Sequence, residues 1–500
     1  MEEDAESRPH RRQKPPPRTI AALLGLLLLV NLSASLYQLP LNRVVERRLC
    51  QEYYSQHDPS VIGPTGDIDE RLCKADAIQA GLGRIQGVMD TEWIVGDFVM
   101  TIPLGFVAER YGRRALLWLN LVPRVFMLSW AVIVGYFDQL LPTNAIVAGP
   151  VLSFLGGDCV FNSITYSLAA GITNDYVLRA SYFGYMSSIT YVVNLLGPAL
   201  ASASMTLLLW LPFWIGITLL GVAVAIIPML PDHEIAKDQR DEQSQPLLSS
   251  PLLKAQDSGP TILHSVIGRF QALRAALATH PWNFSLLLAC FLLASLASSD
   301  TKLLVQYISK RYQWTFASAG YLLSGKAVVN FVLLTVVVPR VLRSAMVASS
   351  GSGASGLSSD RINVRFAKLC LGVSVVGAAA IAVSTTIWLL VPALLVYALG
   401  SALPVFTLSL LKSPSICCPG ADRGDDGRES SSPGADSQTH IFSIVMLVKT
   451  LGSLLGAPLM AFLWVRGIGL GGAALGMPYF VSAGCYAAAI FIFCRIEIDQ

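Results

Sequence analysis

Five ionisable residues lie near the middle of the long apolar runs of this chain, where a charge is costly and usually serves a function. They are Asp97, Arg124 and Asp158 in the first half of the sequence and Lys326 and Lys449 in the second. Counted along a helix from the nearest polar flank, each lies roughly 14–18 Å deep, which is about the middle of a bilayer. Carboxylates at that depth can exchange protons, and ammonium groups there can bind an anion.

The carboxylates are the candidates for proton coupling, with Asp97 as the first choice, Asp158 as the second and Asp90 as a further one. Burial among apolar groups disfavours the charged form of a carboxylate, which brings proton exchange towards the working pH range. The alternative is that Asp97 and Asp158 form a buried structural network with Arg124.

Arg124, Lys326 and Lys449 are candidates for lining a substrate cavity. The second half of the sequence offers no acid at the depth of its two lysines. The lysines therefore either attract an anionic group of the substrate, or pair with Asp97 and Asp158 across the centre as a gate that breaks during transport. We expect the first, because Arg124 already stands near the acids.

Positioning these residues requires membrane-spanning helices. The chain is 53% hydrophobic and 14% charged, whereas a soluble chain carries about 25% charged residues. In lipid an isolated apolar segment satisfies its own backbone only as a helix. We therefore expect an all-α membrane protein with twelve transmembrane helices, whose approximate cores are residues 20–41, 82–108, 115–137, 144–170, 181–205, 207–230, 283–307, 317–338, 366–384, 386–411, 440–464 and 476–494.

Lysine and arginine are unevenly distributed between the two faces, with about 23 on one side of these spans and about 9 on the other. The positive-inside rule then places both termini in the cytoplasm. The largest exterior loop, 43–80, also holds acids, so we expect a structured cap there. Cys50 and Cys73 lie in this loop and either form a disulfide or remain two free thiols. No cysteine spacing indicates a metal site.

A charged segment follows the second expected span, with the sequence Gly105-Phe106-Val107-Ala108-Glu109-Arg110-Tyr111-Gly112-Arg113-Arg114. It resembles the loop between the second and third spans of the major facilitator superfamily, Gly-x-x-x-Asp-Arg-x-Gly-Arg-Arg, with glutamate in place of aspartate. The glycines permit close packing and a tight turn. The resemblance implies a conformational motif in which charge pairing stabilises one state of the protein, formed by Gly105, Glu109, Arg110, Gly112, Arg113 and Arg114.

The resemblance to the superfamily covers about residues 18–495 and implies two six-helix halves around a central site. Residues 37–50 and 306–314 further resemble a fungal branch related to proton-coupled folate-type carriers. The pair Gly197-Pro198 partly resembles a motif of drug:proton antiporters, although Val193 stands where that motif has glycine. This pair favours export, and its alternative role is a helix kink with close packing.

The resulting domain organisation follows the spans and the polar segments between them. It comprises a cytoplasmic tail at 1–19, an N-terminal six-helix half at 20–231, a cytoplasmic linker at 232–281, a C-terminal six-helix half at 282–495 and a cytoplasmic tail at 496–500. Two cytoplasmic loops, 343–361 and 413–439, are rich in Gly, Ser or Asp and need not fold.

These patterns predict a secondary active transporter that works by alternating access, with proton-coupled efflux of a metabolite or drug as the first choice. The alternatives are proton-coupled uptake of an organic anion and a transporter-like receptor or scaffold without net flux. We expect no enzymatic activity, cofactor, metal or nucleic acid. The expected partners are a small-molecule substrate, protons and the lipid bilayer. We expect a monomer in the plasma membrane, with the vacuolar membrane as the alternative location.

Overall fold

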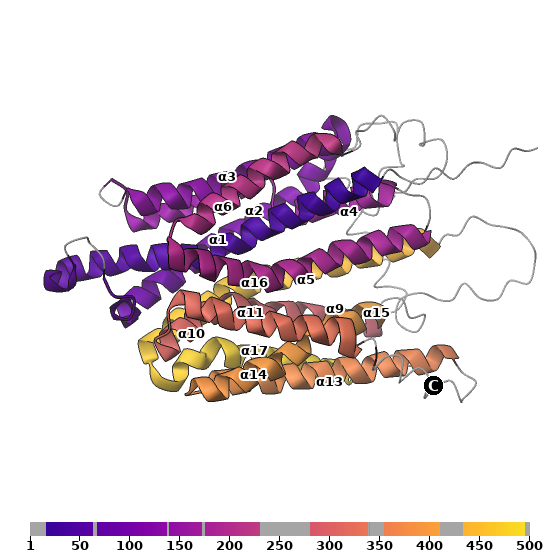
Figure 1. Cartoon of the computed structure of the whole chain (residues 1–500). Helices are drawn as coiled ribbons and strands as arrows, with labels where there is room; N and C mark the ends of the chain where they lie inside the picture. Colours follow the sequence, from indigo (N-terminus) through magenta and orange to yellow (C-terminus); the bar gives the residue numbers. More distant parts are fainter. Residues whose placement is uncertain are drawn as a thin grey trace, which may run out of the picture.

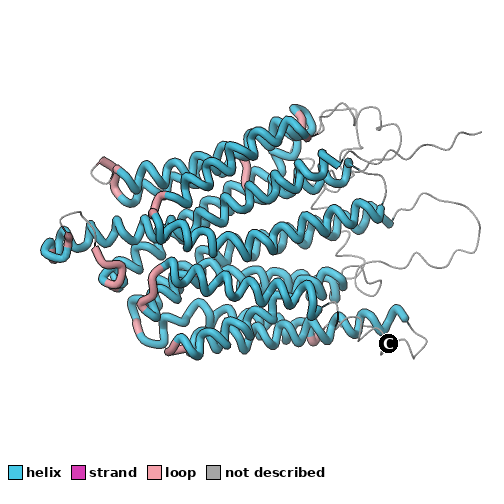
Figure 2. The backbone as a smooth tube through the Cα atoms, in the orientation of Figure 1, coloured by secondary structure: helices cyan, strands magenta, loops and turns pink. Residues whose placement is uncertain are grey.

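The described part of the chain folds into helices (Figure 2). A computed structural model describes residues 17–63, 68–137, 140–172, 176–230, 281–338, 340, 355–410 and 434–495. The first half of the sequence forms α1 (Pro17–His57), α2 (Asp76–Tyr111), α3 (Arg113–Tyr136), η3 (Thr143–Leu155), α4 (Asp158–Ile172), α5 (Tyr176–Leu207) and α6 (Leu211–Ile226), with the short turns η1 (Pro59–Val61), η2 (Leu72–Lys74) and η4 (Ile227–Met229). The second half forms α9 (Pro281–Ser298), η6 (Ser299–Lys302), α10 (Leu304–Tyr312), α11 (Phe316–Val332), η7 (Leu333–Val337), α13 (Ser355–Val383), α14 (Ile387–Leu399), η8 (Gly400–Ala402), α15 (Leu403–Leu410), α16 (Gly434–Leu470), η9 (Gly472–Gly476) and α17 (Met477–Phe493).

Ten of the described helical segments are long and apolar enough to cross a membrane. α2 is also long, at 36 residues, but it carries Asp90, Glu92 and Asp97 among its apolar residues. The segment Ile387–Ala402 is apolar but shorter. Each of the twelve expected spans therefore has a helical counterpart, and ten of these have both the length and the apolarity of a full span.

The helices run between two ends of the bundle, which we name by what they carry (Figure 1). The disulfide end holds the segment between α1 and α2, where the sulfur atoms of Cys50 and Cys73 are bonded at 2.08 Å. α6 ends and α9 begins at the opposite end, the linker end. Helices α1 to α6 form the N half and α9 to α17 the C half. The halves meet where α2 packs against α16 and α5 against α11.

Several expected boundaries are wrong. α1 does not end near residue 41. It includes Pro40 and continues to His57, and an ion pair between Arg43 and Glu46, three residues apart, stabilises the continuation. α13 and α16 begin at Ser355 and Gly434, inside segments that were expected to be loops. The expected linker, 232–281, and both expected tails lie almost wholly outside the described residues.

Large apolar side chains face away from the bundle on many helices. Trp388 is 85% exposed, and Leu389, Val376 and Phe491 are also exposed. Such a surface would aggregate in water, whereas lipid tails solvate it without penalty. The outer surface of the bundle therefore suits a hydrocarbon environment.

Gly112 makes the turn between α2 and α3. Its φ of +92° and ψ of +151° belong to a region that only glycine occupies readily, and its amide donates to the carbonyl of Ala108 at 3.1 Å. The turn is tight because a single residue separates the two helices.

We expect Gly112→Ala to destabilise the fold by roughly 1–3 kcal/mol, because a Cβ strains this backbone conformation. The measurement is the thermal unfolding midpoint of the purified protein in detergent. Gly184→Ala is the matched control, since a Cβ at Gly184 meets nothing within 4 Å. Equal midpoints for the two variants would contradict the strain argument.

Candidate functional site

The fourth span is interrupted halfway through the bundle. η3 ends at Leu155, α4 begins at Asp158, and Gly156 joins them with a φ of +148°. A Cβ at Gly157 would lie 2.3 Å from Cγ of Asp97, so only glycine lets α2 approach this break. Discontinuous helices near the midplane commonly build the ion and substrate sites of carriers, because their ends present free backbone groups.

The side chain of Asp97 caps the N-terminus of α4. The backbone amide of Cys159 donates to Oδ2 of Asp97 at 2.8 Å, while Oδ1 is buried and has no hydrogen-bond partner. The residue is only 6% exposed. A helix N-terminus favours a negative charge, so the cap stabilises the ionised carboxylate. The unpartnered Oδ1 is the atom that a proton would occupy.

Arg124 and Asp158 form an ion pair beside the same break. The Arg124 guanidinium lies 2.6 Å from Oδ1 of Asp158 and also donates to Asn120 at 3.2 Å. The indole of Trp93 donates to the other carboxylate oxygen of Asp158 at 3.1 Å. The Arg124 side chain is 5% exposed and that of Asp158 is 56% exposed. The arginine is therefore a buried anchor, and the carboxylate is the accessible partner.

The C half encloses a cavity of about 290 Å³ that is lined by its own residues. Lys326 of α11 and Lys449 of α16 both line it, together with the amide of Asn330 and the hydroxyl of Ser295. Among the described residues, neither lysine forms an ion pair. The gate in which these lysines pair with the acids of the N half is therefore not formed in this structure.

Asp300 corrects the expectation that the C half lacks an acid at the depth of its lysines. It is fully buried, and the hydroxyl of Tyr397 contacts its carboxylate oxygens at 2.9 and 3.1 Å. The Lys326 ammonium lies 5.2 Å from the centre of the Tyr397 ring. Sequence reasoning placed Asp300 near the exterior end of the expected span 283–307, and its contact with Tyr397 of α14 is a tertiary contact that position along a helix does not report.

Two further candidate residues, Asp90 and Gly197, make contacts away from the break in the fourth span and away from the cavity. Asp90 pairs with Lys302 of the C half at 3.4 Å, so it contributes to the contact between the halves. A Cβ at Gly197 would lie 2.0 Å from Oγ of Ser35, and α5 continues through Pro198. This glycine thus lets α5 pack closely against α1.

The conformational motif is described only in part. The surroundings of Gly105 and the side chains of Glu109 and Arg110 are not described, although the backbone there is helical. Arg114 donates to the carbonyl of Leu230, where the turn after α6 ends. The motif therefore ties the start of α3 to the linker end of the N half.

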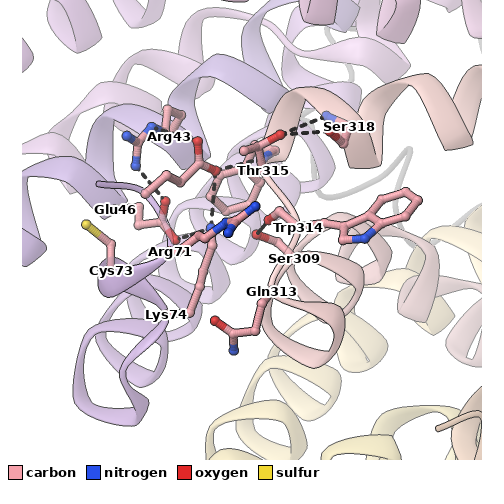
Figure 3. Close-up of polar contacts among 12 residues, drawn as sticks. Arg43, Glu46, Arg71, Cys73, Lys74, Ser309, Gln313, Trp314, Thr315 and Ser318 are labelled. Atoms are coloured by element: carbon pink, nitrogen blue, oxygen red, sulfur yellow. Dashed lines mark hydrogen bonds and ion pairs between the residues drawn. The ribbon is translucent and has the colours of Figure 1, made fainter. Parts of the chain in front are cut away.

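A network of charged residues occupies the disulfide end (Figure 3). We call it the closing network, and it comprises Arg43, Glu46, Glu70, Lys74, Asp76 and Lys310. The Lys74 ammonium is buried and lies 2.6 Å from Glu46 and 3.2 Å from Glu70. Arg43 bonds the same two acids at 2.9 and 3.3 Å. Two cations thus hold two carboxylates beside the Cys50–Cys73 disulfide.

The closing network crosses from the N half to the C half. Glu70 accepts a hydrogen bond of 2.8 Å from the backbone amide of Phe316, the first residue of α11. The Lys310 ammonium lies 2.6 Å from Asp76 at the start of α2. Sequence reasoning missed these pairs. The mixed charges of loop 43–80 and the basic residues after the seventh span were the available signal.

Known transporters have this arrangement, which consists of two helical halves, a broken fourth span and charged residues in the interior of the bundle. The family model described as Major Facilitator Superfamily matches residues 75–415. The chain belongs to the Major Facilitator Superfamily. It is a membrane transporter and not an enzyme.

Curated relatives of this transporter come from filamentous fungi. It is 25% identical over 496 residues to the "MFS efflux pump atnC" of Emericella nidulans, covering 97% of this chain and 90% of that protein. It is 25% identical over 334 residues to the "Efflux pump ustT" of Aspergillus flavus, covering 65% and 62%. Among solved structures, the nucleoside transporter NupG matches with a TM-score of 0.56 at 14% identity, covering 96% of this chain and all of that one. The structural likeness concerns the fold alone.

Proposed function

We propose that this transporter exports a small organic solute by alternating access, coupled to proton movement, and that an anionic group of the solute binds between Lys326 and Lys449. The observation that carries the proposal is the cavity of about 290 Å³ in which both lysines stand without an ion-pair partner among the described residues. A cation near the bilayer midplane is costly unless it meets an anion, so the substrate is its natural counter-charge. Two of the fungal relatives are named efflux pumps, which favours export.

We assign the structure to the state that is open towards the cytoplasm. The disulfide suits an exterior face, because thiols stay reduced in the cytosol. The closing network then seals the exterior. Close packing between the two halves supports this assignment. A Cβ at Gly83 of α2 would lie 2.5 Å from Trp464 of α16, and one at Gly320 of α11 would lie 2.1 Å from Ser202 of α5. Both termini would be cytoplasmic, in the plasma membrane or, alternatively, the vacuolar membrane.

A flux assay in vesicles of defined orientation tests this function. Inside-out vesicles with an acidic lumen should accumulate organic anions from a panel of aromatic and aliphatic carboxylates, and collapse of the proton gradient should reduce accumulation. Flux that requires right-side-out vesicles and an acidic exterior would favour the alternative, proton-coupled uptake of an organic anion. Binding without flux in either orientation would favour a receptor.

Weakening the closing network should open the exterior side more often. Glu70→Gln removes the charge that Lys74 and Arg43 share and weakens the bond to the amide of Phe316. We expect a cysteine introduced at cavity residue Ser298 to react several-fold faster with an impermeant thiol reagent added to the exterior of intact cells.

Glu52→Gln is the matched control for this measurement. Its carboxylate bonds Thr143 within the N half, so its loss does not weaken the contact between the halves. For each variant, labelling is also measured in the same protein without the Ser298→Cys change. Subtracting this value removes the labelling of native cysteines from the result. Equal labelling rates for Glu70→Gln and Glu52→Gln would show that Glu70 does not hold the exterior closed.

A further inference from the structure

Asp300 is a buried carboxylate that the proposed transport cycle does not use. It lies at the start of η6 with no exposed surface, and Tyr397 separates it from the cavity. The Tyr397 hydroxyl contacts both carboxylate oxygens. Burial disfavours the ionised form of this carboxylate, whereas the hydrogen bonds from Tyr397 and the nearby Lys326 ammonium favour it. With its charge retained by these partners, Asp300 places a negative charge directly behind one wall of the cavity.

Lys326 lies over the face of the same Tyr397 ring. Its ammonium faces that ring at 5.2 Å, and Asp300 is the carboxylate whose charge attracts it. The other ionisable groups around Asp300 are tyrosines. Tyr486 contacts the Tyr397 hydroxyl at 3.3 Å, and the Tyr479 hydroxyl lies 3.5 Å from the backbone oxygen of Asp300. Tyrosines are neutral near pH 7, so they leave the charge of Asp300 unbalanced except by Lys326.

The cavity therefore has two ammonium groups and one carboxylate close to it, which leaves a single positive charge. We propose that Asp300 makes this cavity selective for singly charged anions. A monoanion neutralises the remaining charge, whereas a dianion leaves one negative charge in a region of low dielectric, where that charge is costly. The proposal rests on the proposed function, because it presupposes that Lys326 and Lys449 bind the solute.

The size of the cavity guides the choice of probe. Its volume of about 290 Å³ lies at the small end of ligand pockets, which span about 300–1,000 Å³. Benzoate and phthalate are small enough for a cavity of this size. Each contains one aromatic ring, but benzoate carries one carboxylate and phthalate carries two. They differ mainly in charge, and their relative affinity therefore reports the charge balance of the site.

Calorimetric titration of the purified full-length protein measures both affinities, at a pH where phthalate is a dianion. The parent should prefer benzoate. Asp300→Asn should shift the ratio of affinities towards phthalate by about tenfold or more, because it removes one unit charge near the ligand. Asp58→Asn makes the same change in net charge at an exposed position and should leave the ratio unchanged.

Four results would overturn the proposal. An unchanged ratio in Asp300→Asn, with both anions weakened in Lys326→Gln, refutes the selection by Asp300 and leaves the proposed anion site intact. Absence of binding by the parent, or no effect of Lys326→Gln on either anion, refutes the site as well. If Asp300→Asn does not fold, Ser298→Asp tests the reverse change on the cavity wall. It should weaken phthalate about tenfold more than benzoate, and equal weakening of both would refute the proposal.

Discussion

Replacing Lys449 or Lys326 with glutamine should weaken transport of an anionic substrate about 10- to 100-fold, since a hydrogen bond to a charged group is worth about 1.5–3 kcal/mol. Neutral substrates should be affected little. The physical reason is that both ammonium groups line the cavity and neither forms an ion pair among the described residues. The measurement is the concentration dependence of flux for an anionic and a neutral compound in the same vesicles.

Lys368→Gln is the control. It removes the same charge from α13, and Lys368 does not line this cavity. The competing role is a gate in which the lysines pair with Asp97 and Asp158 in another state of the cycle. In that case Lys449→Gln would impair every substrate equally, and a paired Asp→Asn change would restore part of the activity. Unchanged affinity for the anion in both lysine variants would exclude substrate binding by either residue.

Asp97→Asn should separate transport from the proton gradient. The amide oxygen of asparagine can still accept the bond from Cys159, and its NH2 group occupies the position of the unpartnered Oδ1. The variant should therefore fold and exchange solute across the membrane. It cannot exchange a proton at this position, so the stimulation of flux by a pH gradient should fall by about tenfold or more.

Asp97→Ala completes this experiment. It removes both the charge and the cap of α4, so it should also lower the thermal unfolding midpoint, by an amount that corresponds to about 1 kcal/mol. A loss of coupling in both variants, with lowered stability only in the alanine variant, assigns proton exchange to the carboxylate and capping to its oxygen. A normal pH dependence in Asp97→Asn would mean that another residue carries the proton, and Asp158 would be tested next.

The fold was largely accessible from the sequence, because apolar length and charge motifs are local properties. The apolar runs located a helical segment for each expected span, ten of them long and apolar enough to cross a membrane, and the segment from Gly105 to Arg114 indicated the family. Interruptions were missed. The break at Gly156-Gly157 depends on the approach of Asp97 from α2, which is a tertiary contact that hydropathy does not encode.

The candidate site was accessible only where residue type and depth sufficed. The three midplane acids and bases of the N half, Asp97, Arg124 and Asp158, lie around one break, and the two lysines line one cavity. Asp300 was not considered as a neighbour of the lysines, because it approaches Lys326 through Tyr397, which is a tertiary contact. Pairings such as Glu70 with Phe316 join residues far apart in the sequence, and no periodicity reports them.

The Cys50–Cys73 bond has a consequence for how the protein matures. It joins the end of α1 to the turn that carries Lys74, and Glu70 lies three residues before its second cysteine. In the proposed orientation this segment faces the exterior, so it would acquire its covalent tether only in an oxidising compartment, after crossing the membrane during synthesis. In a newly inserted chain, all spans would be in place, but the closing network would lack the disulfide beside it. Passage through the secretory pathway would complete the seal before the protein reached its final membrane.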